Sequence, residues 1–132
     1  MRLLIDTHFV VWVALEPDRL SEAELQLCFS PENDIFVSAV SIWEIRLKFY
    51  KFRHRTDASF LSPAGAINLC VGAGLQIVPL SAETCAWVIE PAPAHKDPFD
   101  EILLAQAAAM GARLLTRDNQ LLAHPLAISA YS

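Results

Sequence analysis

Short apolar runs that alternate with segments of helical pattern constrain the fold of this chain more than any other feature. Two of them, RLLI near the start and RLLT near the end, lie directly or closely before an aspartate. Runs of this kind are typical of strands buried in a parallel sheet. Such strands, alternating with helices of about ten residues, predict an α/β sandwich around a mostly parallel sheet of about four to five strands. The predicted strands are Arg2–Ile5, Ile35–Val37, Leu75–Val78, Arg113–Thr116 and, more weakly, Leu126–Ile128.

Helix start and stop signals fill the intervals between these runs. A serine followed three residues later by glutamate forms a capping box, proline fits the first helical position, and glycine ends a helix. Asp97, Pro98 and Gly111 fit the cap, the first residue and the stop of one helix. The other predicted starts are Ser21 with Glu24, for a helix through about Phe29; Ser41 with Glu44; Ser62 with Pro63, for a helix closed by Gly72 or Gly74; and Ser81, for a helix that stops before Pro91.

The composition fits a single compact domain over residues 1–132. The chain is 54% hydrophobic and 19% charged, and its net charge of −5 argues weakly against nonspecific attraction to nucleic acid. The three cysteines, Cys28, Cys70 and Cys85, lie in apolar contexts, which favours small core residues in a reducing compartment. No stretch has the length of a signal peptide or a membrane span, so we expect a soluble, cytoplasmic protein with no membrane contact.

Carboxylates gather where functional groups meet in open parallel sheets, at the carboxyl ends of strands and the helix starts that follow them. Asp6 follows the first predicted strand, Asp118 follows a later one, and Asp97 and Asp100 open the helix that leads to it. Glu44 lies in the first turns of the helix after the Ile35–Val37 strand, so it can reach the same edge. Each acid also has a local explanation: Asp97 as a helix cap, Asp100 and Glu44 as capping-box acids, Asp6 and Asp118 as turn acids, and Glu101 as a solvated first-turn charge.

Several carboxylates in one cleft repel one another unless they take up protons or meet a positive charge. A divalent cation supplies that charge, and oxygen ligands favour a hard ion, Mg²⁺ or Mn²⁺. Zn²⁺ would instead recruit histidine or thiolate, and the four histidines show no ligand spacing. The chemistry that such a site best serves is hydrolysis of a phosphodiester, in which the ion lowers the pKa of a bound water.

At this point the residues resemble the PIN domain family, and in particular the VapC-type toxins of toxin–antitoxin pairs. The resemblance covers nearly the whole chain. The matching segments are LLIDTHFVVW at 3–12, VSAVSIWEIRLK at 37–48, LQIVPLSAE at 75–83, HKDPFDEILLAQA at 95–107 and LLTRD at 114–118.

The resemblance implies a PIN-like three-layer α/β/α sandwich and an endoribonuclease that hydrolyses RNA. It also implies that Asp6, Glu44, Asp100 and Asp118 form the acidic quartet that binds Mg²⁺ or Mn²⁺, with Asp97 as an additional acid. The implied partners are an RNA substrate, a cognate VapB-like antitoxin and a second copy of the chain in a homodimer. Many relatives carry a glycine-lysine turn after the helix that bears the glutamate, whereas this chain reads FYKFRHRTD at 49–57.

The basic residues of this acidic chain cluster just after Glu44. Such a cluster can offset the repulsion between an acidic cleft and an RNA backbone. A solvated helix end is the alternative explanation, and the interleaved aromatic residues favour core or partner packing over base stacking. The same holds for Trp12 and Trp43, whose apolar helical spacing favours core or dimer contacts. Thr116 is predicted to orient an acid or a water through its hydroxyl. The candidate RNA-binding residues are Arg46, Lys48, Lys51, Arg53 and Arg55, with His54 among them.

Other functions fit parts of the pattern. A catalytically silent PIN-like binding protein would keep the acids without turnover. An aspartate-based phosphatase also places an acid after its first strand, but it usually has a second aspartate where His8 stands. A phospho-receiver domain normally has adjacent acids after the first strand and a late lysine, whereas this chain has Asp6-Thr7 and Thr116-Arg117.

Overall fold

The computed structural model describes residues 1–52, 61–94 and 97–130, and these form a five-stranded sheet in the order β3-β2-β1-β4-β5. All neighbouring strands pair in parallel. The predicted parallel sheet is therefore confirmed, its weaker last strand included. The strands are β1 (Arg2–Ile5), β2 (Asp34–Ser38), β3 (Gln76–Val78), β4 (Arg113–Leu115) and β5 (Ala127–Ile128).

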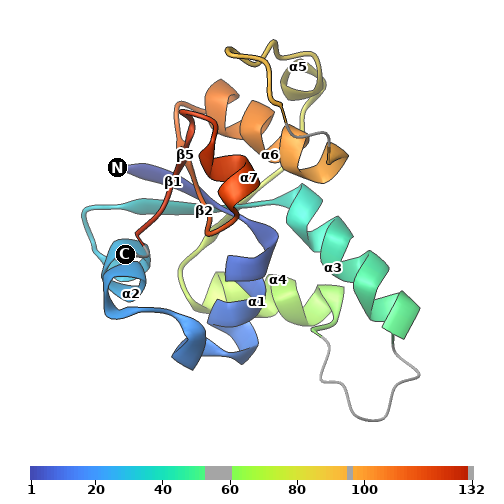
Figure 1. The fold of residues 1–132 in the computed structure, drawn as a ribbon. Coiled ribbons are helices and arrows are strands. Elements are labelled where there is room, and N and C mark those ends of the chain that lie inside the picture. The colour runs from blue at the N-terminus through green and yellow to red at the C-terminus, as the bar shows by residue number, and fades with distance from the viewer. Residues whose placement is uncertain (53–60, 95–96, 131–132) are drawn as a thin grey trace.

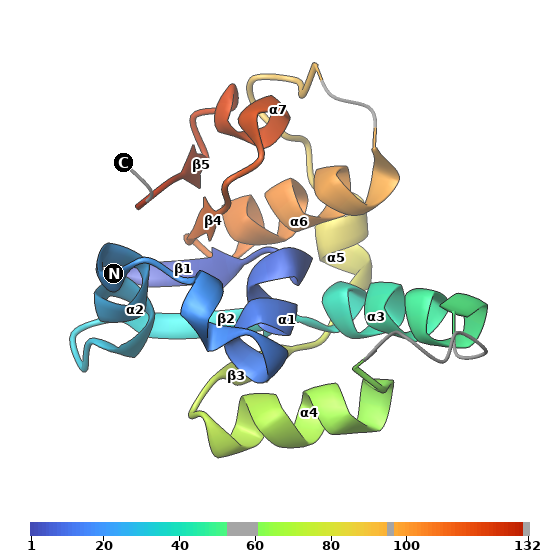
Figure 2. The same ribbon diagram turned by 60° about the horizontal axis from the view of Figure 1, so that its bottom comes forward.

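Helices cover both faces of this sheet, which gives the predicted three layers (Figures 1 and 2). On one face lies α6 (Pro98–Ala109), accompanied by the short helices α5 (Ala82–Cys85) and α7 (Asn119–Leu122). On the other face lie α1 (Thr7–Leu15), α2 (Glu22–Phe29) and α4 (Pro63–Gly72), with the 3-10 helix η1 (Pro17–Arg19) between α1 and α2. The long α3 (Ala39–Phe52) contacts α1, α4 and α6 and so flanks the end of the sheet.

Alternating side chains of the central strands face the two helical layers. Leu3 and Ile5 of β1 pack into a core cluster with Phe9 of α1, whereas Leu4 packs into a second cluster with Leu103 of α6. All of these side chains are almost completely buried. Because both faces of the strand are covered, the sequence of β1 is apolar at consecutive positions.

Most of the predicted helix ends are confirmed by their caps. Ser21 and Glu24 form a complete capping box at α2, and Asp97 accepts hydrogen bonds from the amides of Phe99 and Asp100 at α6. Gly74 and Gly111 follow α4 and α6 with φ values of 79° and 64°, the left-handed region that glycine adopts without strain. Ser62 and Ser81 cap α4 and α5 as predicted, although α5 already ends at Cys85.

The predicted capping box of Ser41 and Glu44 is wrong. The helix α3 begins earlier, at Ala39, and the hydroxyl of Ser38 accepts a hydrogen bond from the Val40 amide. Ser41 and Glu44 lie inside the helix, where their spacing of three places both on one face. Their side chains contact Thr7 instead, so a pattern that predicted a helix start belongs to the cleft described below.

Two of the three cysteines are core residues, as predicted. Cys28 and Cys70 are buried, and burial together with the charge of Glu24 raises the pKa of Cys28 to about 11, so this thiol is unreactive at neutral pH. Cys85 is exposed, which corrects the prediction for that residue. Within the described ranges no helix has the length and hydropathy needed to cross a membrane.

Candidate functional site

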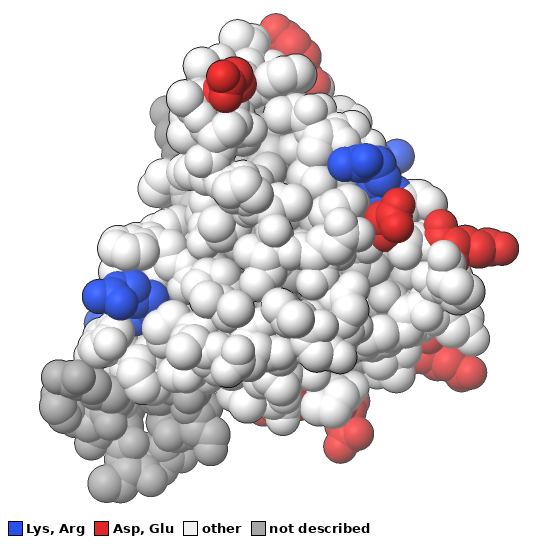
Figure 3. Space-filling view, turned by 180° about the vertical axis from the view of Figure 1, so that it is seen from behind, with Lys and Arg blue, Asp and Glu red and all other residues white. Residues whose placement is uncertain are grey.

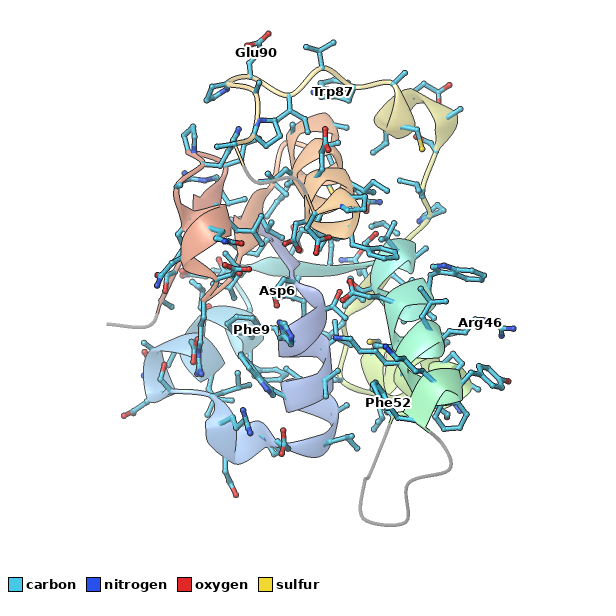
Figure 4. The ribbon with its side chains drawn as sticks, turned by 45° about the vertical axis from the view of Figure 1, so that its right-hand side comes forward. Asp6, Phe9, Arg46, Phe52, Trp87 and Glu90 are labelled. Atoms are coloured by element: carbon cyan, nitrogen blue, oxygen red, sulfur yellow. The ribbon has the colours of Figure 1, made fainter. Side chains whose placement is uncertain are left out.

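A cleft of about 350 Å³ opens at the carboxyl ends of the central strands. It brings together all four acids of the predicted quartet and the additional acid Asp97. In Figure 4 the labelled Asp6 lies where β1 passes into α1, between the ribbons of α6 and α3. The strand-end prediction therefore holds for five acids, which come from four separate segments of the sequence. The cleft is lined by Asp6, Thr7, His8, Glu44, Lys48, Asp97, Asp100, Asp118, Gln120 and Leu121.

Asp6 is the most deeply placed of these acids, and only 5% of it is exposed. One carboxylate oxygen caps α1 by accepting the Phe9 amide at 3.1 Å, and the other accepts the Thr116 hydroxyl at 2.5 Å. Burial raises the pKa of Asp6 above its ordinary value of 3.8, although the hydrogen bonds from Thr116 and Phe9 and the charge of His8 act in the opposite direction. The cleft thus holds a carboxylate whose charge is costly without a positive partner.

The hydroxyl of Thr116 links two of the acids. It donates to Asp6 and accepts a hydrogen bond from the Asp118 amide at 3.0 Å, while the residue itself is fully buried. Its single proton is used on Asp6 and one of its lone pairs on the Asp118 backbone. These two bonds connect the end of β1 to the end of β4. The sequence predicted that Thr116 orients an acid or a water, and its bond to Asp6 fits that role.

Glu44 enters the cleft from α3. Its Oε1 lies 3.1 Å from the Thr7 hydroxyl, which also lies 2.9 Å from the Ser41 hydroxyl, and its Oε2 lies 3.6 Å from Lys48 Nζ. Thr7 has one hydroxyl proton, so it can donate a hydrogen bond to only one of these two neighbours at a time. These contacts join α1 to α3 at the edge of the cleft. The sequence had given no role to Thr7 and only a helix-capping role to Ser41, although the i, i+3 spacing of Ser41 and Glu44 was a signal for a shared face.

Asp97 and Asp118 also have the capping roles that were weighed for them. Asp97 Oδ1 accepts the Phe99 amide at 2.9 Å and the Asp100 amide at 3.3 Å, and Asp118 Oδ1 accepts the Gln120 amide at 2.9 Å. Both residues also line the cleft. Capping and a role in the site therefore coexist.

The potential metal ligands of the cleft are mainly carboxylate and hydroxyl oxygens, which suit a hard divalent cation. As the side chains stand, no three Asp, Glu, His or Cys groups of the described residues lie close enough together to hold a metal ion. Asp6, Glu44, Asp97 and Asp118 are directed instead towards the hydroxyl, amide and ammonium partners given above. Ion binding would therefore require some of these side chains to change rotamer.

The basic cluster that follows Glu44 is divided by the structure. Lys48 lines the cleft, whereas Arg46 packs over the rings of Trp43 and Tyr50 and points away from Asp6 in Figure 4. Lys51 lies over the ring of Phe52 at the end of α3. Among the described cations only Lys48 is at the cleft, so a continuous patch is not formed by them. Arg53, His54 and Arg55 lie outside the described residues.

Arg117 follows Thr116 in sequence but is not part of the cleft lining, and it contacts α1, η1 and α2 instead. Its guanidinium donates to both carboxylate oxygens of Glu24 and, at 2.6 Å, to the carbonyl of Arg19, and it stacks over the Trp12 ring at 4.6 Å. Burial raises the pKa of Glu24, but the hydrogen bonds and charge of Arg117 and the bonds from Ser21 outweigh it, so the net shift is downward. This ion pair ties the end of β4 to α2.

Three comparisons with known proteins agree with this fold. The family model described as PIN domain matches residues 3–125. A curated relative from Mycobacterium tuberculosis, named Ribonuclease VapC22, is 30% identical over 122 residues, which are 92% of this chain and 91% of the relative.

Solved structures share the fold at low sequence identity. The VapBC2 structure from Rickettsia felis, bound to a DNA fragment from its promoter, has a TM-score of 0.69 at 16% identity and covers 98% of this chain and 97% of its own. A toxin–antitoxin complex from Klebsiella pneumoniae has a TM-score of 0.61 at 18% identity and covers 98% of each chain. At these identities the likeness supports the arrangement of helices and strands.

Proposed function

Since this chain belongs to the PIN domain family, we propose that it is a cytoplasmic, metal-dependent endoribonuclease that acts as the toxin of a toxin–antitoxin pair. The observation that carries the proposal is the convergence of Asp6, Glu44, Asp100 and Asp118 on one cleft. The relative named as a ribonuclease covers nearly the whole chain and supports RNA as the substrate. The proposed cofactor is Mg²⁺ or Mn²⁺, with Asp97 as a further acid near the ion.

The residues of the cleft suit hydrolysis of a phosphodiester. A divalent ion held by these acids would supply a water of lowered pKa and would stabilise the negative charge on the phosphate oxygens. Asp6 is held in place by Thr116 and by the Phe9 amide, so it offers its charge to the ion without further ordering. Lys48 lies at the rim, where its ammonium reduces the repulsion between the acids and an approaching RNA backbone. No side chain has to become covalently attached to the RNA.

Metal removal provides the direct test. We expect RNA cleavage by the purified protein to stop in EDTA and to return with excess Mg²⁺ or Mn²⁺. Because burial raises the pKa of Asp6, a proton competes with the ion for this carboxylate over a higher pH range than for an ordinary aspartate. The concentration of Mg²⁺ that gives half of the maximal rate should therefore fall as the pH rises through that range. Cleavage that is insensitive to EDTA would contradict the proposal, and RNA binding without any turnover would indicate a silent PIN protein.

We infer that the protein is a homodimer that uses the outer face of α3. Trp43, Leu47 and Tyr50 follow one another on this face and are 54%, 45% and 46% exposed. Figure 3 shows a broad surface with few charged side chains behind the view of Figure 1. Exposed apolar surfaces of this kind mark protein interfaces. Light scattering should give twice the chain mass of 14.6 kDa, and Trp43→Asp should give a folded monomer. A wild-type monomer at high micromolar concentration would refute the dimer.

The proposed inhibitor is a VapB-like antitoxin. The structure of similar fold from Klebsiella pneumoniae is described as a toxin–antitoxin complex, and the one from Rickettsia felis as VapBC2 bound to promoter DNA, which supports a partner of this type. A small reading frame beside the gene is the natural candidate. The same light-scattering measurement, repeated with the product of that reading frame, tests whether the two proteins form a complex.

A further inference from the structure

A second hollow lies beside the acidic cleft and differs from it in chemistry. It has a volume of about 200 Å³ and lies between α1 and α3. His8 and Lys48 line both hollows, so the two meet at these residues. Carboxylates are absent from its described lining, which is apolar and aromatic apart from those two residues. The hollow is lined by His8, Val11, Trp12, Ile45, Lys48, Phe49 and Leu61.

We propose that this hollow binds a nucleobase of the RNA next to the cleaved phosphodiester, by stacking against His8 and Trp12. The proposal deepens the proposed function and rests on it, because the neighbouring cleft is taken to hold the phosphodiester. A base and its phosphate belong to one nucleotide, so a base site must adjoin the phosphate site. The shared residues His8 and Lys48 satisfy that requirement.

The aromatic rings of the hollow are ordered before any ligand binds. His8 and Trp12, four residues apart on α1, are stacked with their ring centroids 5.9 Å apart and their planes 23° from parallel. Trp12 is held from other directions by the edge of Phe9 at 5.3 Å and by the Arg117 guanidinium. A base that stacks on rings already fixed in this way loses little extra entropy in the protein. His8 itself is exposed, so its ring is accessible to solvent.

The lining favours a base over the other parts of an RNA chain. Val11, Ile45 and Leu61 offer apolar surface that a flat base covers and a phosphate or ribose does not. Lys48 marks the border at which the charged backbone would pass into the acidic cleft. Every base has a face that can stack, so the main effect of this site is to position the RNA. Selectivity between bases comes only from ring size and edge contacts.

Fluorescence of Trp12 tests the base site without any cleavage. The chain has three tryptophans, and Trp43 and Trp87 are exposed, so Trp43→Phe with Trp87→Phe leaves Trp12 as the reporter. Adenosine 5′-monophosphate should quench this emission, and ribose 5-phosphate should not. His8→Ala should weaken binding of the nucleotide by roughly 5- to 100-fold, the range for loss of one stacking contact with a base. His8→Phe keeps an aromatic ring and should retain binding.

Cleavage kinetics then separate this inference from the proposed function. A short RNA that spans a cut site mapped on cellular RNA is compared with the same RNA lacking one base beside the cut. With the wild-type protein, the RNA that lacks the base should have a lower kcat/KM than the complete RNA. The factor should be about the same as the one by which His8→Ala lowers kcat/KM on the complete RNA. With His8→Ala, removal of the base should lower kcat/KM little further. Equal cleavage of both RNAs by the wild type overturns the base site and leaves the nuclease intact, whereas no cleavage of any RNA refutes the nuclease. Quenching by the antitoxin but not by the nucleotide would assign the hollow to the protein partner and overturn the inference.

Discussion

Replacing Asp6 with asparagine should lower the rate of RNA cleavage by roughly 10²- to 10⁴-fold, the range for a positioned catalytic group, and leave the fold intact. The substitution removes the negative charge that would hold the ion and puts an amide nitrogen in place of one oxygen. Asparagine is an equally good helix cap, so the bond from the Phe9 amide to the carbonyl oxygen of residue 6 can persist. The Thr116 hydroxyl can rotate to accept from the new amide.

The stability of this variant distinguishes loss of chemistry from loss of structure. The pKa of Asp6 is raised in the folded protein, so the native state binds the proton more tightly than the unfolded chain. In the absence of metal, the native state therefore loses stability as the pH rises from the ordinary value of 3.8 through the raised pKa. Asp6→Asn removes this loss, so its melting temperature at pH 7 without metal should equal or exceed that of the wild type. Such a gain of stability on loss of function is common at charged sites.

Asp34→Asn is the matched control for the loss of activity. Asp34 begins β2 at the opposite edge of the sheet and is exposed, so removal of its charge should leave cleavage unchanged. Rates at saturating Mg²⁺ and thermal melts in EDTA are needed for all three proteins. Full activity of Asp6→Asn, or equal losses in both variants, would show that the acidic cleft is not the site of cleavage.

Much of the fold followed from local sequence because its signals agree with one another. The strand β1 is apolar at consecutive positions since both faces are covered, and Asp97, Pro98 and Gly111 mark the ends of α6 by their own backbone chemistry. The convergence of the acids followed from the sheet, because the carboxyl ends of parallel strands meet at one edge. These predictions needed only residues that are close in the sequence and a general rule of topology.

The parts that failed depend on contacts between distant residues. Ser41 and Glu44 match a capping box, but Ser38 starts the helix and Thr7 of another helix takes their side chains. Arg117 stands next to Asp118 in the sequence, yet it pairs with a glutamate 93 residues away. A local pattern cannot say which distant group will compete for a side chain. The second hollow was missed for the same reason, because α1 and α3 each supply only half of it.

The ion pair between Arg117 and Glu24 gives the largest expected effect on stability. Arg117→Ala should lower the free energy of unfolding by about 3–5 kcal/mol, because it leaves a buried carboxylate without its positively charged partner. Glu24 is completely buried, while the Arg117 side chain is 24% exposed. A loss of this size should lower the melting temperature by on the order of 10–20 °C. The exposed pair of Arg19 and Glu16 is the control, since Glu16→Gln should cost about 1 kcal/mol or less.

The pH dependence identifies the charge as the cause. In the wild type the pKa of Glu24 is lowered from its ordinary value of 4.5, so the pair contributes stability that is lost as the pH falls through the lowered value. Without Arg117, burial dominates and the pKa of Glu24 should rise, so acidification should stabilise the variant relative to the wild type. If only the packing of Arg117 on Trp12 mattered, the stability lost in Arg117→Ala relative to the wild type would be the same at every pH.

The double variant Glu24→Gln with Arg117→Ala should be more stable than Arg117→Ala alone at neutral pH, because its buried side chain at residue 24 carries no charge. Chemical denaturation of the wild type, Arg117→Ala, Glu24→Gln and the double variant at pH 7 and pH 4 decides between these causes. A loss of stability that does not change with pH, together with additive losses in the double variant, would exclude the buried ion pair as the source of the stability.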